Sequence, residues 1–190
     1  YFIDASGFES IIFKHLNPKW NDIKEYLPLD KALSQEIDNK NNEIPSHTLA
    51  EATDNGWIWA IPVADKIRTG YLYSSKFLSD EEAREKYNDW LIKNHNINLK
   101  NDKTIKFRSG YYEKSFIGNC MAVGLASGFV EPLEALASQM LLNQLNAFTN
   151  YSSSLNNLDF DRERINDENR HFIDANIKFV ALHYVTNRTD

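Results

Sequence analysis

The chain has 190 residues, of which 42% are hydrophobic, 25% charged and 13% aromatic. These values are typical of a folded domain, and they exclude a disordered chain, a collagen-like repeat and a coiled coil. The net charge is −6 at pH 7, which argues against nucleic acid or an anionic membrane surface as the main partner. The one cysteine, Cys120, cannot form an internal disulfide, so we expect a reducing compartment, the cytoplasm. The longest apolar stretch, around 121–130, is too short and too broken by glycine and serine to span a membrane.

The first third of the chain combines short strands with polar, proline-containing stretches. Residues 2–5 and 10–13 are predicted strands around a glycine-containing turn, and 17–45 is predicted to be irregular with one helix near 30–37. The sequence starts inside the first of these strands and without a methionine, and residues 183–190 end equally abruptly. We therefore expect a segment of a longer protein.

An aromatic hairpin is predicted in the middle of the chain. Residues 56–63 form a strand on which Trp57 and Trp59 share one face, since successive strand side chains alternate. Residues 71–75 form a second strand after a turn, and its two tyrosines also share a face. We expect an antiparallel pair in which aromatic side chains face each other across the strands.

Three helices are predicted from residue 79 onward. Ser79 and Glu82 form a capping-box pattern that begins a helix ending near His95. Apolar residues at helical spacing predict two further helices, at 131–148 and at about 161–185. With additional strands at 104–107, 111–117 and 120–125, the irregular alternation predicts a mixed α/β (α+β) fold.

Residues 119–138 carry the most chemical information. They combine a buried strand, a turn of small residues that includes Gly124, and a helix start at Pro132. Small residues leave the backbone open to a flat ligand, and the first amides of a helix attract anions. Glu131 and Glu134 fall in the same predicted first turn. The alternative is an ordinary capped core helix after a buried strand.

Four motifs together give this pattern a specific interpretation. They are Gly56-Trp57-Ile58-Trp59-Ala60-Ile61-Pro62, the stretch from Gly124-Leu125 to Phe129-Val130-Glu131-Pro132-Leu133-Glu134, the turn Ile3-Asp4-Ala5-Ser6-Gly7-Phe8, and Leu182-His183-Tyr184. Their residues, order and rough spacing resemble the flavin-dependent tryptophan halogenase family. The match spans nearly the whole chain.

The resemblance implies part of an FAD-binding fold like that of the aromatic hydroxylases, with an antiparallel substrate-side sheet and long C-terminal helices. Residues 1–16 and 104–150 would belong to the FAD-binding domain, 17–103 to the substrate-side sheet and helix, and 151–190 to the start of a helical region. A separate reductase would supply FADH2. Reduced flavin, oxygen and chloride, bromide or iodide would then give a hypohalous acid equivalent that halogenates tryptophan, an indole or another electron-rich aromatic.

The resemblance also implies roles for individual residues. Glu134 would be the catalytic glutamate that orients the electrophile or removes the substrate proton, and its alternative is a helix-capping or solvent-facing residue. The residues near the cofactor would be Asp4, Gly7, Gly124, Leu125 and Ser138, although a structural hairpin is an equal alternative for the first two. The backbone amides of Leu136 and Ala137 would hold the halide.

Other features of the resemblance limit or extend these roles. The tryptophans Trp57 and Trp59 would separate substrate from flavin and so suppress hydroxylation, unless they are simply core residues. Family members typically carry a hydroxyl residue after the glutamate, whereas this chain has Ala135-Leu136-Ala137, which predicts altered halide preference. The phosphate-binding glycine fingerprint and the family's essential lysine are not matched in these residues. The five histidines show no metal-ligand spacing, so no metal is expected.

Two alternatives to halogenation stay open. One is a flavin monooxygenase that hydroxylates its aromatic substrate, and the other is a non-catalytic remnant of the family. Members of the family often form homodimers, and dimerisation is expected on that ground alone.

Overall fold

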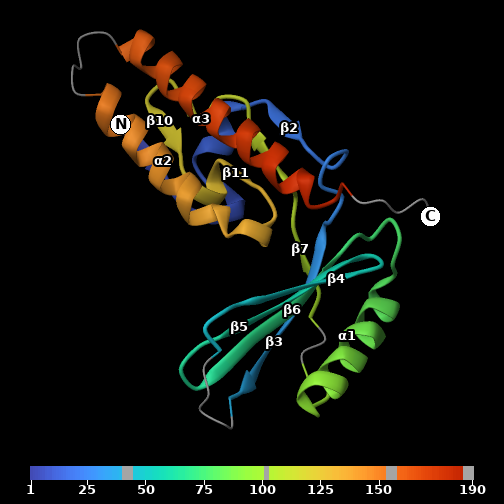
Figure 1. Ribbon diagram of the computed structural model, residues 1–190. Coiled ribbons are helices and arrows are strands. Elements are labelled where there is room, and N and C mark those ends of the chain that lie inside the picture. The colour runs from blue at the N-terminus through green and yellow to red at the C-terminus, as the bar shows by residue number, and fades with distance from the viewer. Residues whose placement is uncertain (40–44, 101–102, 153–157, 186–190) are drawn as a thin grey trace. The chain divides into compact units, whose positions relative to one another are not determined.

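The structure, a computed structural model, describes residues 1–39, 45–100, 103–152 and 158–185. It divides into two compact units, one made of Tyr1–Leu27 and Arg108–Asp190 and the other of Pro28–Phe107 (Figure 1). The expected boundaries at 16 and 104 differ from these, because the strand β2 (Trp20–Asp22) pairs with β8 (Gly110–Tyr112) inside the first unit.

The first unit contains two small sheets. In one of them, β1 (Phe2–Asp4) pairs in parallel with β10 (Cys120–Ala122), which pairs antiparallel with β9 (Phe116–Ile117). In the other, β8 lies between β2 and β11 (Gly128–Phe129). Short 3-10 helices connect these strands: η1 (Gly7–Glu9), η2 (Phe13–Leu16), η3 (Gly124–Ala126) and η4 (Pro132–Glu134).

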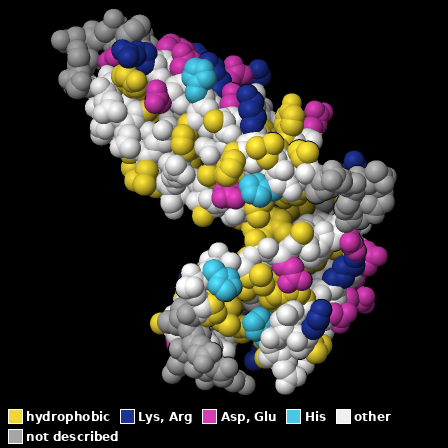
Figure 2. All heavy atoms as spheres, viewed as in Figure 1, with side chains coloured by type: hydrophobic (Ala, Val, Ile, Leu, Met, Phe, Trp, Pro, Cys, Tyr) yellow, Lys and Arg dark blue, Asp and Glu magenta, His cyan; other side chains and the backbone are white. Residues whose placement is uncertain are grey.

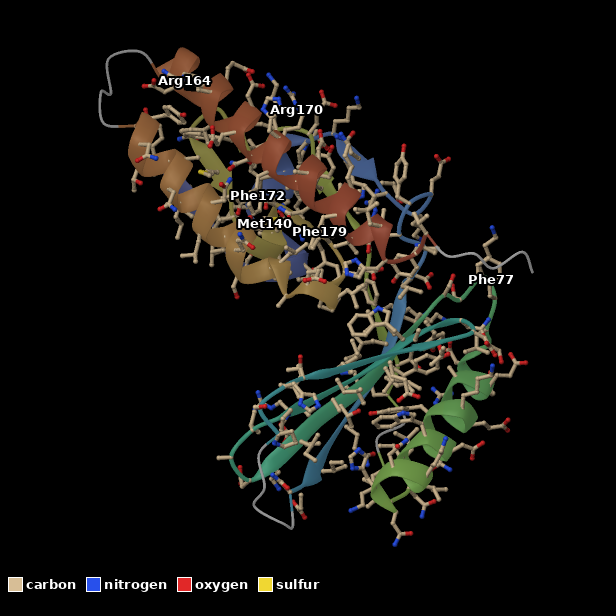
Figure 3. The ribbon with its side chains drawn as sticks, viewed as in Figure 1. Phe77, Met140, Arg164, Arg170, Phe172 and Phe179 are labelled. Atoms are coloured by element: carbon tan, nitrogen blue, oxygen red, sulfur yellow. The ribbon has the colours of Figure 1, made fainter. Side chains whose placement is uncertain are left out.

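Two long helices complete the first unit. The helices α2 (Leu136–Tyr151) and α3 (Leu158–Leu182) lie side by side (Figure 1). Met140 of α2 and Phe172 of α3 meet in the core between them (Figure 3). None of the helices in the described part of the chain is long and apolar enough to cross a membrane.

The second unit is a five-stranded antiparallel sheet with one helix. Its strand order is β4-β5-β6-β3-β7, with bounds Leu49–Thr53, Gly56–Pro62, Lys66–Tyr73, Lys31–Asp38 and Ile105–Lys106. The helix α1 (Asp80–His95) begins at the predicted capping box, because Ser79 accepts from the Glu82 amide and Glu82 accepts from the Ser79 amide. Figure 2 shows acidic and basic side chains along the outer face of this helix, whereas Tyr87 and Leu91 of α1 are buried in the core of the unit.

The register of the hairpin corrects the predicted aromatic pairing. Trp57 lies opposite Leu72 and Trp59 lies opposite Gly70. The two tryptophans therefore occupy one face of the sheet, while Tyr71 and Tyr73 occupy the other and pack in the core with α1. Both strands were expected, but the aromatic side chains do not face each other across them.

Two predicted elements near the start of the chain are wrong. Residues 31–38 form the strand β3 instead of a helix, because β6 and β7 supply hydrogen-bonding partners on both sides. Long-range pairing here overrides the helix propensity of residues such as Ala32 and Leu33. Residues 10–13 are not a strand, since they form the turn that leads into η2.

The predicted helix at 131–148 is interrupted near its start. Residues 132–134 form the separate 3-10 helix η4, and Ala135 adopts a left-handed conformation with φ of 54° before α2 begins. A non-glycine residue rarely adopts this conformation, so no helical spacing could have indicated it. The break separates Glu134 from the helix whose first turn it was expected to occupy.

Candidate functional site

The parallel strands β1 and β10 bring two glycine turns to one edge of their sheet. Because the strands run in the same direction, their carboxyl ends lie together, and the Val123 amide donates to the Asp4 carbonyl at 2.9 Å. The chain then turns at Gly7 on one strand and at Gly124 on the other, and η1 and η3 lie side by side. Ligands of α/β folds commonly bind beyond the carboxyl ends of parallel strands.

Asp4 holds the first of these turns together. Its side chain is 1% exposed, and one carboxylate oxygen accepts from the amides of Ile12 at 2.8 Å and Phe13 at 2.7 Å. The other oxygen accepts from the amide and hydroxyl of Ser6. Burial raises the pKa of Asp4, but these hydrogen bonds outweigh it and hold the pKa below its ordinary value. The contacts of Asp4 thus fix the backbone from Ser6 to Phe13.

A buried side chain of α2 fixes the second turn. Gln144 is 1% exposed, and its Oε1 accepts from the Gly124 amide at 2.7 Å. Its Nε2 donates to Ser127 Oγ at 2.6 Å, and that hydroxyl donates to the Gly124 carbonyl at 2.8 Å. The three residues close a hydrogen-bonded ring that ties η3 to α2. Sequence reasoning missed Gln144, and its only signal is an amide at a position that faces the core between Met140 and Ala147.

Gly124 itself is needed for its backbone conformation. Its φ is +58°, and an added Cβ would meet only Leu141 Cδ1, at an ordinary 3.8 Å. Gly7 has φ +72°, and an added Cβ there would meet nothing within 4 Å. Gly7, Gly124 and the neighbouring Leu125 are each half-buried, so both turns keep part of their backbone exposed.

We expect Gly124→Ala to lower stability by about 1 kcal/mol, because an L residue at positive φ is strained. The added methyl group would also stand on the partly exposed turn and weaken FAD binding to the full-length protein. Gly118→Ala is the matched control, since Gly118 also has φ +58°, has open space around its Cβ, and lies in the turn between β9 and β10. A titration of FAD fluorescence should separate the two variants, and equal FAD affinity in both would contradict the assignment of the Gly124 turn.

The predicted catalytic carboxylate lies directly before α2. Glu134 ends η4, its side chain is 35% exposed, and its Oε1 lies 2.8 Å from His183 Nε2. The N-cap residue of α2, Ala135, provides no side-chain hydrogen bond to the first amides of the helix. A carboxylate and a row of uncapped amides therefore lie next to each other at a positive helix end.

The residues expected to hold halide and cofactor follow in the first turn of α2. The Leu136 side chain is 6% exposed and packs in the core with Val130 and Met140. Its bulk is therefore directed into the core, although the expected halide contact is its backbone amide. Ala137 is half-buried and lines a small apolar pocket with Phe172, and Ser138 is exposed.

The two tryptophans lie in the second unit on the sheet face opposite α1. Trp57 is 7% exposed and its ring centre is 6.0 Å from that of Trp59, which is half-buried. Trp59 covers Gly70 so closely that a Cβ on that glycine would lie 2.1 Å from the indole ring. Both rings are thus packing residues of this sheet, whatever further role they have.

We expect Trp59→Ala to destabilise the second unit by about 2 kcal/mol, less than the 3–5 kcal/mol typical of a fully buried tryptophan. A thermal melt of the full-length protein measures this loss, and an unchanged midpoint would contradict the packing interpretation. Mass spectrometry of the reaction products tests the second role, because a soluble variant that hydroxylates the substrate would show that packing is not the whole function of Trp59.

In the part of the chain that the structure describes, the other reactive groups form neither a metal-ligand cluster nor an activated thiol. The described residues contain no group of three or more His, Cys, Asp or Glu side chains that could hold a metal ion. The Cys120 thiol is buried, and burial together with the nearby charge of Asp4 raises its pKa. A buried thiol with a raised pKa is a poor nucleophile.

Comparison with known proteins adds an independent line of evidence. The family model described as tryptophan halogenase matches residues 1–190. The chain belongs to the tryptophan halogenase family. It is 32% identical over 196 residues to tryptophan 7-halogenase RebH of Lentzea aerocolonigenes. This alignment covers 100% of the chain and 36% of that protein. It is 29% identical over 193 residues to 7-chloro-L-tryptophan 6-halogenase KtzR of Kutzneria sp. (strain 744). That alignment covers 96% of the chain and 36% of KtzR.

Solved halogenase structures have the same fold. Tryptophan 6-halogenase SttH from Streptomyces toxytricini superposes with a TM-score of 0.90 at 29% identity, over 100% of this chain and 37% of that one. BrvH, a flavin-dependent halogenase from Brevundimonas sp. BAL3, superposes with a TM-score of 0.86 at 28% identity. The superposition covers 100% of this chain and 38% of that one. The mixed α/β fold is therefore confirmed. The chain spans about a third of the length of the relatives it matches.

Membership of a flavin-dependent family implies FAD, and the residues at the strand edge fit a flavin. Gly7 and Gly124 supply two adjacent, partly exposed stretches of backbone without side chains of their own. Asp4 and Gln144 hold these stretches in place from within the protein, so a ligand would meet a preformed surface. These contacts are compatible with the cofactor roles expected for Gly7, Gly124 and Leu125.

Proposed function

We propose that the full-length protein carrying this chain is an FAD-dependent halogenase acting on tryptophan, an indole or another electron-rich aromatic. One observation carries the proposal: two partly exposed glycine turns lie together at the carboxyl edge of a parallel strand pair. The ring formed by Gln144 ties one of them to the helix that begins beside Glu134. When bound, reduced FAD supplies the activation of oxygen that turns a halide into a hypohalous acid equivalent.

The chain's own residues would bind the flavin and the halide. The turns at Gly7 and Gly124 would approach the ring through backbone, with Leu125 and Ser138 nearby. The amides of Leu136 and Ala137 would hold chloride, bromide or iodide, supported by the positive end of α2. Asp4 would act indirectly, because its carboxylate is already occupied by the amides of the first turn.

Glu134 would act on the substrate. A partly exposed carboxylate can orient the halogen carrier by a hydrogen bond and can accept the ring proton that leaves after halogen addition. Trp57 and Trp59 would keep the aromatic substrate from the flavin and so suppress hydroxylation.

The partners follow from the same chemistry. We propose a separate flavin reductase as the source of FADH2, an aromatic small molecule as the substrate, and a homodimer as the assembly. We also propose a cytoplasmic location, which the single buried thiol of Cys120 supports.

The test is to supply the full-length protein with FAD, a reductase, oxygen and each halide in turn, with a panel of indoles and phenols. Mass spectrometry should show a product heavier by one halogen in place of one hydrogen, and a preference for bromide or iodide would support the effect expected of Ala135-Leu136-Ala137. Addition of oxygen alone would identify a hydroxylating monooxygenase. If the panel yields neither a halogenated nor a hydroxylated product, the non-catalytic alternative is favoured.

A further inference from the structure

The end of α3 holds both carboxylates of the segment around η4. Glu131 is fully buried and accepts a hydrogen bond from the Tyr184 hydroxyl. Glu134 contacts His183, the residue next to Tyr184. Two acids three positions apart are thus held by two adjacent residues, so the motif around Glu134 and the motif at 182–184 are partners in space.

The ring of His183 faces hydrogen-bond acceptors on both sides. Its Nδ1 lies 3.3 Å from the carbonyl oxygens of Phe179 and Val180, and its Nε2 lies 2.8 Å from Glu134 Oε1. Carbonyl and carboxylate oxygens only accept, and a neutral imidazole has only one N–H. The contact with a Glu134 carboxylate is therefore favourable when Nε2 carries a proton. The geometry fits His183 Nε2 as the donor and Glu134 Oε1 as the acceptor.

Two helix ends favour this arrangement of donor and acceptor. His183 directly follows Leu182, the last residue of α3, where the helix dipole is negative and favours a cation. Glu134 precedes Leu136, the first residue of α2, where the dipole is positive and favours a carboxylate. The side chains of His183 and Glu134 are 38% and 35% exposed, so water can reach the pair.

We propose that His183 is a positioning residue for Glu134, an inference that rests on the proposed halogenase function. Its Nε2–H engages Oε1 and fixes the carboxylate, while Oε2 has no hydrogen bond to any described residue. After halogen addition, the ring C–H bond breaks, its electron pair restores the aromatic ring, and the proton forms an O–H bond at Oε2. His183 fixes which oxygen takes this proton.

The protonation of the ring can be measured without any turnover. In the full-length protein labelled with 15N, histidine NMR should show a proton on Nε2 of His183. The signals of His183 are identified as those that disappear from the spectrum of the His183→Gln variant. A ring that lacks the Nε2 proton would overturn the proposal, because Glu134 would then have to be the donor.

Kinetics with a ring-deuterated substrate tests the effect on proton removal. We expect His183→Phe to form product about 10-fold more slowly, with unchanged KM for the aromatic substrate, unchanged FAD affinity and a new primary isotope effect. His183→Gln, which keeps an N–H donor, should recover most of the rate. His171→Gln is the control, since His171 is an exposed residue of α3.

The outcomes separate this inference from the proposed function. A His183→Phe enzyme with the wild-type rate and no isotope effect would overturn the positioning role while leaving halogenation intact. If the wild-type protein forms no halogenated product, the proposed function fails, and the NMR result still decides whether His183 donates to Glu134. Should the Phe variant fail to fold, the Gln variant and the NMR spectrum carry the test.

Discussion

Replacing Glu134 by Gln is expected to lower the rate of substrate halogenation by at least about 100-fold. The reason is that a positioned general base typically accelerates a reaction by a factor of roughly 10²–10⁴. The amide keeps the size of the side chain but cannot accept a proton from the substrate. The structure makes this substitution informative, since Glu134 is partly exposed beside the start of α2 and no core packing depends on it. The measurement is the rate of halogenated product per full-length enzyme with saturating halide and reduced FAD.

The matched control is Glu85→Gln, an exposed carboxylate on α1. It should leave both the rate and the stability unchanged. Oxidation of reduced FAD in the Glu134 variant should stay at the wild-type rate, because the carboxylate is needed for the aromatic substrate and not for the flavin. Halogenation by Glu134→Gln within a few-fold of wild type would assign Glu134 to helix capping, the alternative interpretation of its position.

Asp4→Asn is expected to be the most destabilising single change at the site, at about 3 kcal/mol. Hydrogen bonds to a charged group contribute about 1.5–3 kcal/mol each, and the lost contacts include the amides of Ile12 and Phe13. Both oxygens of the Asp4 carboxylate accept from backbone N–H groups. An asparagine here would replace one of these acceptors by an NH2 group, which cannot accept a hydrogen bond. Thermal or urea unfolding of the full-length protein measures the loss, and Asp89→Asn on the exposed face of α1 is the control.

The effect of Asp4 has a defined pH dependence. Because its pKa is lowered in the folded protein, its contribution to stability is fully present above the unfolded value of about 3.9. That contribution is lost as the pH falls through the lower folded pKa. The stability difference between wild type and Asp4→Asn should therefore be constant near neutral pH and shrink below about pH 4. A difference that grew on acidification would contradict this account of Asp4.

Local signals in the sequence predicted the parts of the fold that depend on neighbouring residues. The capping box at Ser79 and Glu82 lies within one helical turn, and the strand, small-residue turn and helix at 119–138 follow one another along the chain. The resemblance to halogenases placed Glu134 and Gly124 in one functional segment. The structure adds that their segment joins the turn at Gly7, through a parallel pairing of strands over a hundred residues apart in sequence.

Features that depend on distant partners could not be predicted from local pattern. The strand β3 has helix-forming residues, and its pairing with β6 and β7 makes it a strand. Gln144 has a core-facing position in α2, but the sequence does not show that its partner there is the amide of Gly124. The contact between His183 and Glu134 joins two helix ends 49 residues apart, which no local spacing could indicate.

The most direct test of this account is to locate a bromide ion by its anomalous scattering in crystals of the full-length protein with FAD. We predict a bromide in contact with the backbone amides of Leu136 and Ala137, with the flavin ring against the turns at Gly7 and Gly124. A bromide bound elsewhere in a protein that halogenates its substrate, or a flavin placed away from these turns, would contradict it.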